Sequence, residues 1–172
     1  MGLYKVRLEE SGERTRRFKI LLFAESPDRL HGEILSPVGS TVMIFDSGAG
    51  RLAVTFVRDR EAYVGTADPA AMEAVFGLRM TLGQLVGGLL TGEGGTDELR
   101  MVREASVDGL PDRLELSSGP RTLTLDLRRR LALRERPGGV GTGRPPEGMT
   151  ERPLDELRLH PLPEEIEQTP TG

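Results

Sequence analysis

The chain has 172 residues, of which 37% are hydrophobic and 29% are charged, and its net charge is -4. This size and composition predict one ordinary globular domain and exclude a disordered, collagenous or helical membrane-spanning chain. The absence of cysteine excludes disulfide frameworks, thiolate zinc sites and thiol nucleophiles. The acidic balance argues against a nucleic-acid partner, because such a partner requires a basic face that neutralises phosphates.

The first third of the chain predicts a β meander. Apolar residues recur at every second position in short runs, which cover residues 3–8, 18–23, 30–35, 42–45, 52–56 and 63–64. This period is typical of strands, because successive side chains of a strand point to opposite faces. Turn-forming residues separate the runs, as in Ser36-Pro37-Val38-Gly39.

Two amphipathic helices follow the meander. Asp68 before Pro69 predicts a helix start, because the carboxylate caps free N–H groups and proline loses no hydrogen bond at the first position. This helix ends at Gly77. Thr81 and Gln84 form a capping box for a second helix, whose leucines and valine recur at helical intervals as far as residue 90.

Strand patterns return over residues 100–105, 114–116 and 123–133. The order of elements is therefore β, two helices, then β, which predicts a mainly β fold of the α+β class. We expect a folded domain over residues 1–135 and a flexible Gly- and Pro-rich loop over 136–153. Residues 154–172 are predicted to form an edge strand followed by a disordered tail.

No motif gathers the residues that catalysis would require. His31 and His160 are the only histidines and lie in no metal-ligand spacing, so each is interpreted as a surface or strand residue. No serine lies in a Gly-x-Ser-x-Gly elbow. The glycine-rich runs 48–50 and 138–143 do not join a strand to a capped helix, so we interpret them as loops. We predict no catalytic residue, no metal and no cofactor, and hence a protein that is not an enzyme.

Two stretches resemble a known family. They are residues 33–42, which form a strand, turn and strand around Pro37-Val38-Gly39, and the helix pair within residues 75–92. Over residues 3–92 the chain resembles the LolA and LolB group of periplasmic lipoprotein carriers and outer-membrane lipoprotein receptors, and it looks closer to the receptor LolB. This resemblance implies an incomplete antiparallel β-barrel, or half-barrel, with a helical lid over an apolar cavity that accepts acyl chains.

The resemblance also implies a place and partners. The chain would bind acyl chains of lipoproteins or other lipids, for lipoprotein transport or insertion at the outer membrane. It would act in the periplasm as a monomer, with a LolA-like carrier and the outer-membrane surface as partners. Pro37, Val38 and Gly39 match the protruding loop of the receptor, whose apolar tip faces the membrane. There is no lipobox cysteine, so anchoring would require a lipid-bearing segment upstream of Met1.

The apolar side chains of the strands and helices are predicted to line the cavity. The strand residues expected to point inward are Phe18, Ile20, Leu22, Leu30, Ile34, Val42, Ile44, Leu52, Val54 and Phe56. The residues expected to form the lid are Met72, Phe76, Leu85 and Leu89. The inward face of residues 41–46 stays open, because Met43 and Phe45 compete with Val42 and Ile44. Burial of an acyl chain contributes about 0.8 kcal/mol per methylene.

Two other functions stay open from the sequence. A structural or assembly module of the cell envelope would have a fully packed core and no cavity of ligand size. A small enzyme acting on a lipid-like substrate would carry a buried carboxylate with a raised pKa beside the pocket. The sequence leaves the identity of the ligand and the direction of any transfer undetermined.

Overall fold

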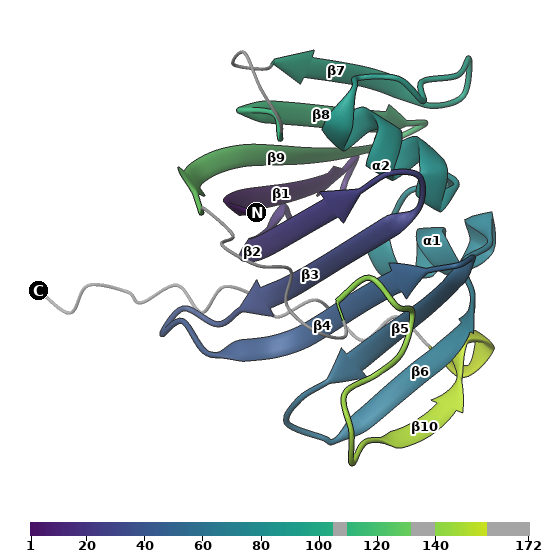
Figure 1. Ribbon diagram of the computed structural model, residues 1–172. Coiled ribbons are helices and arrows are strands. Elements are labelled where there is room, and N and C mark those ends of the chain that lie inside the picture. The colour runs from purple at the N-terminus through teal and green to yellow at the C-terminus, as the bar shows by residue number, and fades with distance from the viewer. Residues whose placement is uncertain (105–109, 132–139, 158–172) are drawn as a thin grey trace, which may run out of the picture.

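The computed structural model describes residues 1–104, 110–131 and 140–157, which form a single ten-stranded sheet and two helices (Figure 1). The strand order is β10-β6-β5-β4-β3-β2-β1-β9-β8-β7. The first six strands are β1 (Gly2–Glu10), β2 (Arg16–Glu25), β3 (Arg29–Leu35), β4 (Thr41–Gly48), β5 (Arg51–Phe56) and β6 (Glu61–Thr66). The others are β7 (Arg100–Glu104), β8 (Arg113–Ser118), β9 (Arg121–Arg130) and β10 (Thr150–Pro153).

Strands β1 to β6 form the predicted meander. Each pairs antiparallel with the next through a short turn, as period-two patterns with intervening Gly, Pro and Ser residues favour. Strand β1 also pairs antiparallel with β9, so the first strand of the chain lies inside the sheet and joins its two halves. All neighbouring strands are antiparallel except β6 and β10, which are parallel.

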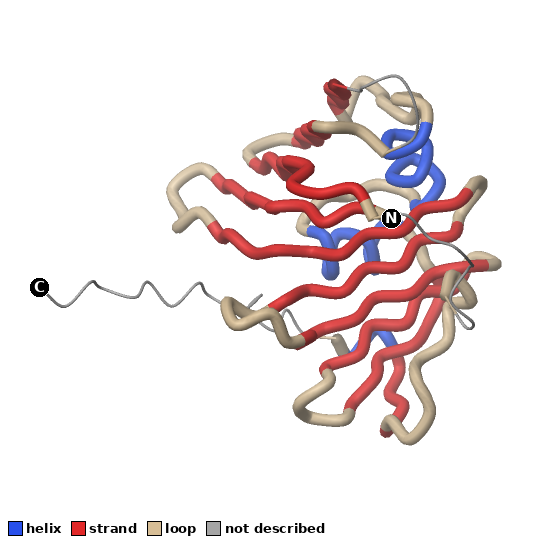
Figure 2. The backbone as a smooth tube through the Cα atoms, turned by 60° about the vertical axis from the view of Figure 1, so that its left-hand side comes forward, coloured by secondary structure: helices blue, strands red, loops and turns tan. Residues whose placement is uncertain are grey.

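Both helices lie on one face of the sheet, which we call the helix face (Figure 2). Helix α1 (Pro69–Phe76) starts as predicted, because the Asp68 carboxylate accepts a hydrogen bond of 2.8 Å from the Ala71 amide. Gly77 ends α1 in the left-handed conformation, at φ 77°. Helix α2 (Leu82–Leu90) begins with the predicted capping box of Thr81 and Gln84. The local signals therefore place both helices correctly.

The sheet is open. Strands β7 and β10 are its outermost members among the described residues, and they do not pair with each other. The mainly β fold with two helices is confirmed in this coarser form. The apolar side chains of the helix face and of both helices form one core cluster, which includes Tyr4, Ile20 and Leu89.

Residues 140–149 cross the other face of the sheet, over β4 to β6, and we call this segment the strap and this face the strap face (Figure 1). The strap leads into β10, so the described part of the expected loop at 136–153 is bound to the sheet. The expected strand after residue 154 is a different structure, because Leu154–Glu156 forms a 3-10 helix, η1. Residues 136–139 and 158–172 of these predictions lie outside the described residues.

Candidate functional site

The space between the sheet and the two helices is filled by the protein's own side chains. The void left there measures only about 40 Å³, whereas ligand pockets have roughly 300–1,000 Å³. Eight of the residues predicted to line a cavity surround this void, namely Phe18, Ile20, Leu22, Leu30, Ile34, Phe76, Leu85 and Leu89. Leu52 and Met72 are fully buried in the core and border neither the void nor the cleft described below. A ligand-sized cavity beneath both helices is therefore absent from the described structure.

Strand β4 presents the other of its two apolar faces to the core. Met43 lies opposite Ile34 in the sheet, and Met43 and Phe45 are both buried and border the void. Alternation along the strand places Ile44 on the strap face. Val42 lies at the register shift between β3 and β4 and packs, partly buried, against the core cluster. Neither Val42 nor Ile44 borders the void, so Met43 and Phe45 take the place that was predicted for them.

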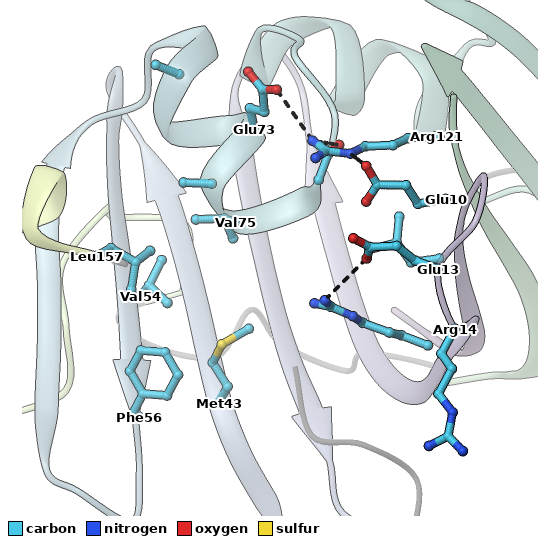
Figure 3. Close-up of a pocket in the computed structure, with 15 residues that line it drawn as sticks. Glu10, Glu13, Arg14, Met43, Val54, Phe56, Glu73, Val75, Arg121 and Leu157 are labelled. Carbon is cyan, nitrogen blue, oxygen red and sulfur yellow. Dashed lines mark hydrogen bonds and ion pairs between the residues drawn. The ribbon is translucent and has the colours of Figure 1, made fainter. Parts of the chain in front are cut away.

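A larger cleft opens on the helix face beside α1 (Figure 3). Its volume is about 430 Å³, which lies within the range of ligand pockets. The predicted residues Val54 and Phe56 lie on its floor, and Leu8, Met43, Val75 and Leu157 add to the apolar lining. The other lining residues include a charged rim of three arginines and three glutamates: Glu10, Glu13, Arg14, Arg16, Glu73 and Arg121. The cleft thus combines an apolar floor with an ionic border.

The position of α1 depends on an aromatic contact. The ring of Phe76 meets the ring of Phe45 edge to face, with centroids 4.9 Å apart. Gly32 on β3 makes room for the Phe45 ring, because a Cβ atom at this position would strike it. Helix α1 turns the small residues Ala70 and Ala74 toward the cleft. The helix is thus fixed against β4 while the space beneath these alanines stays open.

Arg121 connects the rim of the cleft to the end of α1. Its Nε lies 3.0 Å from the Glu10 carboxylate, and its Nη1 lies 3.4 Å from the Glu73 carboxylate (Figure 3). Nη1 also donates to the carbonyl oxygen of Gly77 at 3.2 Å. The three ionic side chains are roughly one-third exposed, so each ion pair contributes at most about 1 kcal/mol. Arg121 therefore links β1, β9 and α1 with contacts that can be broken.

The predicted membrane-facing loop is a tight turn between β3 and β4. The amide of Ser36 donates to the Ser40 carbonyl at 2.8 Å, and Gly39 has φ 88°, which favours glycine. Pro37 and Val38 occupy the tip, and Val38 is 89% exposed. The turn therefore presents a valine to solvent without a partner among the described residues.

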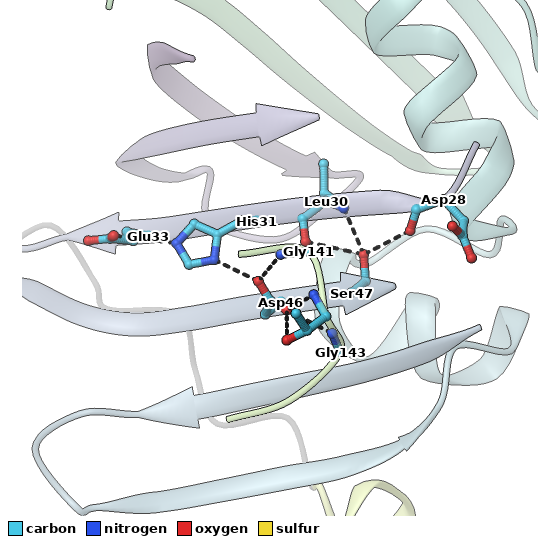
Figure 4. Close-up of polar contacts among 9 residues, drawn as sticks. Asp28, Leu30, His31, Glu33, Asp46, Ser47, Gly141 and Gly143 are labelled. Carbon is cyan, nitrogen blue, oxygen red and sulfur yellow. Dashed lines mark hydrogen bonds and ion pairs between the residues drawn. The ribbon is translucent and has the colours of Figure 1, made fainter. Parts of the chain in front are cut away.

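The strap face holds a buried polar cluster that the sequence did not reveal (Figure 4). Asp46 accepts backbone hydrogen bonds from Gly141, Thr142 and Gly143 at 2.7, 2.7 and 2.8 Å, and one of its oxygens lies 2.9 Å from His31 Nδ1. Burial raises the pKa of Asp46, but the hydrogen bonds from His31 and from the three amides outweigh it and hold the pKa below its ordinary value. Asp46 is the only buried carboxylate in the ranges that the structure describes.

His31 has carboxylates on both sides of its ring. Nε2 lies 3.4 Å from Glu33 Oε1, opposite the contact of Nδ1 with Asp46. Burial lowers the pKa of His31, but the hydrogen bonds to Asp46 and Glu33 outweigh it, and the pKa is raised. With both ring nitrogens engaged, this arrangement favours attachment of the strap over acid–base catalysis. An enzyme that acts on a lipid-like substrate was expected to have a buried carboxylate with a raised pKa. The pKa of Asp46 is lowered instead.

Sequence reasoning missed the cleft and the cluster for different reasons. Ala70 and Ala74 are four residues apart and share one side of α1, which is a signal for space above that side. Asp46 follows four apolar residues within one strand, which is a signal for a buried carboxylate with partners. The contact of Arg121 with Glu10 and Glu73 has no local signal, because it joins three separate elements.

No family model matches the chain, and no curated protein matches its sequence. Within residues 1–104, 110–131 and 140–157, no three His, Cys, Asp or Glu side chains come together in a way that could hold a metal ion. The same residues include no helix of the length and apolarity needed to cross a membrane. Inferences about function therefore depend on the cleft, the turn and the strap.

Proposed function

We propose that the chain is a non-catalytic binding protein that holds the acyl chain of a lipid or lipoprotein in the cleft beside α1. The observation that carries this proposal is a cleft of about 430 Å³ with an apolar floor, next to an interior with only about 40 Å³ unfilled. The site is thus displaced from the centre of the helix face to one side of α1. A groove of this size accepts one chain, and a multi-chain lipid anchor would enter by a single chain.

Two physical features support the proposal: the free energy gained when an acyl chain is buried, and the gap that α1 leaves above the cleft floor. Each methylene that enters the cleft contributes about 0.8 kcal/mol, and the floor residues Met43 and Val54 are already shielded from water. Helix α1 meets the floor mainly through Phe76 and buried Met72 and Val75, while its alanines leave a gap. In this proposal the curved sheet acts as a half-barrel and α1 acts as its lid.

The exposed turn gives the proposal a direction. Strand β3 ends at Leu35, which lies opposite Lys19 near the start of β2. The cleft residue Arg16 is the first residue of β2. The Val38 tip, which follows β3, and the cleft therefore lie at the same end of the sheet. We propose that Pro37, Val38 and Gly39 face a membrane and that the chain passes to or from the cleft there. Lipoprotein transport at the outer membrane, in the periplasm and with a LolA-like carrier, is the setting that the family resemblance adds to this proposal.

The cleft is tested by filling it. We expect Ala74→Trp to weaken the binding of a fluorescent fatty acid about tenfold, because loss of space for roughly two methylenes removes about 1.6 kcal/mol. Val102→Trp is the matched control, since it adds the same ring on β7 at a partly exposed position outside the cleft. Equal binding by both variants and the unaltered protein, with circular dichroism showing intact sheets, would reject the cleft as the site.

The turn is tested separately from the cleft. Val38→Glu is expected to reduce co-sedimentation with lipid vesicles, because a charge at an inserted tip must be taken out of water. Val102→Glu serves as control, since Val38 and Val102 are the two large hydrophobic residues found exposed in the described structure. The same loss in both variants, or in neither, removes the turn from the site.

The filled interior favours a second candidate, a structural or assembly module of the cell envelope. With about 40 Å³ left between the sheet and the helices, the core resembles that of a scaffold protein. This candidate predicts that no single-chain lipid binds at any concentration below micelle formation. The fatty-acid titration described above therefore separates the two functions.

A further inference from the structure

The charged rim of the cleft contains two kinds of residue. Glu10, Glu73 and Arg121 belong to one interconnected group, in which the Arg121 guanidinium contacts both carboxylates and the end of α1. Arg79 also approaches the Glu73 carboxylate, at 3.6 Å. The charges of this group are thus engaged with each other, and its function in the structure is to hold α1 in place.

The second group comes from the hairpin between β1 and β2 and is much less engaged. It consists of Glu13, Arg14 and Arg16, all of which line the cleft. Arg16 Nη2 lies 4.0 Å from Glu13 Oε2, which is too long for a hydrogen bond and weak in water. Arg14 is exposed and has no hydrogen bond or ion pair among the described residues, and its side chain stands apart from the ion pairs in Figure 3. Two cations and one anion therefore leave one positive charge on this side of the cleft.

The orientation of Arg16 follows from its place in the hairpin. Arg16 lies opposite Leu8 in the sheet, and Leu8 is part of the apolar cleft lining. Arg16 therefore points to the helix face, whereas Arg17 points to the strap face. A cation thus lies directly beside the apolar floor, as an amphiphile with a charged head and an apolar tail requires.

Resting on the proposed lipid-binding function, we infer that the cleft selects a single-chain amphiphile with an anionic carboxylate or phosphate head group. The head binds Arg14 and Arg16 and displaces the weak contact with Glu13, while the tail lies on the floor formed by Met43, Val54 and Phe56. Guanidinium groups fit this role, because their planar donors match the geometry of carboxylates and phosphates. The volume of about 430 Å³ sets the limit of one chain.

The inference is tested with ligands that share one tail and differ in the head. Dodecanoate, dodecyl phosphate, dodecylphosphocholine, dodecyl maltoside and dodecyltrimethylammonium compete, below their micelle concentrations, with a fluorescent fatty acid bound to the full chain. We expect the two anions to compete about fivefold better than the maltoside at low salt, as two exposed charge contacts allow. Higher salt should reduce this preference, because the charges are accessible to screening ions.

Matched variants assign the preference to the hairpin. The double variant Arg14→Gln, Arg16→Gln should bind all five ligands with the affinity of the maltoside, whereas Arg17→Gln, an exposed cation on the same strand but the opposite face, should keep the preference for anions. Equal competition by all heads, or a preference for the phosphocholine or the cation, would overturn the inference and leave the lipid site standing. If no ligand displaces the probe, or the probe does not bind, the proposed function itself fails.

Discussion

The two faces of the sheet are held by different kinds of contact. On the helix face, apolar side chains pack against α1 and α2 and leave both a void and a cleft. On the strap face, the Asp46 carboxylate receives three backbone hydrogen bonds and one from His31. Apolar contacts have no required direction, so they tolerate gaps, whereas a buried carboxylate must be satisfied at defined positions. The faces thus separate a region whose packing leaves gaps from a region whose polar contacts are fixed in direction.

The glycines of the strap show how close its fit is. Gly141 approaches Gly48 so closely that a Cβ on Gly48 would collide with the Gly141 carbonyl. Gly141 and Gly143 both have positive φ, at 71° and 67°, which turns their amides toward Asp46. By contrast, the rim of the cleft on the helix face has an ion pair of 4.0 Å. The molecule is therefore expected to respond to mutation very differently on the two faces.

The largest effect is expected at Asp46. Asp46→Ala removes the acceptor of three backbone N–H groups, and we expect a loss of about 3 kcal/mol in the free energy of unfolding. Asp46→Asn retains one acceptor oxygen and should lose less. Urea unfolding measures both changes. A loss below about 1 kcal/mol for the alanine variant would mean that the strap is held elsewhere.

The next largest effect is expected from added volume beneath the strap. Gly48→Ala forces the Gly141 carbonyl away, and overpacking of this kind costs about 1–3 kcal/mol. Hydrogen exchange of the Thr150, Glu151 and Arg152 amides should increase, because β10 follows the strap. Gly83→Ala on α2 is the contrasting control, since a Cβ there meets only Thr81 Oγ1, at an ordinary contact distance of 4.0 Å, and it should raise stability by up to about 1 kcal/mol. Similar changes in both variants would contradict the close fit.

A smaller effect is expected from pH. Because the pKa of His31 in the folded protein is raised above its ordinary 6.5, its contribution is complete below pH 6.5 and is lost as the pH rises through the folded value. Asp46 acts in the opposite direction, and its contribution is lost only in acid, as the pH falls through a depressed pKa. Stability measured from pH 6 to 9 should therefore decrease, and His31→Gln should flatten this decrease. An unchanged slope in the variant would show that another group titrates.

The smallest effect on stability is expected at Arg121. Its ion pairs are partly exposed, so Arg121→Gln should cost about 0.5 kcal/mol. The same variant should increase hydrogen exchange at Val75 and Phe76 and speed the entry of the fatty-acid probe, because α1 loses its link to β1. Faster exchange at α2 alone would show that Arg121 does not restrain α1.

The elements of the fold could be predicted because their signals are local. Asp68-Pro69 and the capping box at Thr81 determine where the helices begin, and alternation determines the strands of the meander. The face of β4 could not be predicted, because Val42 to Phe45 are all apolar and provide no contrast between faces. A register shift between Ile34 and Leu35 sets which of them face the core, and it appears only when β3 and β4 pair.

The strap and the cleft could not be predicted for a further reason. Residues 140–149 have the composition of a linker, and their structure comes from Asp46, which lies 95 positions before Gly141 in the chain. Strand β10 is exposed throughout, so no hydrophobic pattern indicates it. The cleft is a place where packing stops, and no sequence pattern specifies a missing contact except small residues such as Ala74.

The position of β1 between β2 and β9 has a consequence for how the chain reaches its native state. Gly2 of β1 must pair with Arg130 of β9, which closes a loop of well over a hundred residues. Only then are β9, β8 and β7 joined to the rest of the sheet. Closure of such a loop loses entropy in advance of any compensating contact, and folding rates fall as contacting residues lie further apart in the chain. During that search, β1 exposes an unpaired edge, and such an edge favours aggregation of the incompletely folded chain.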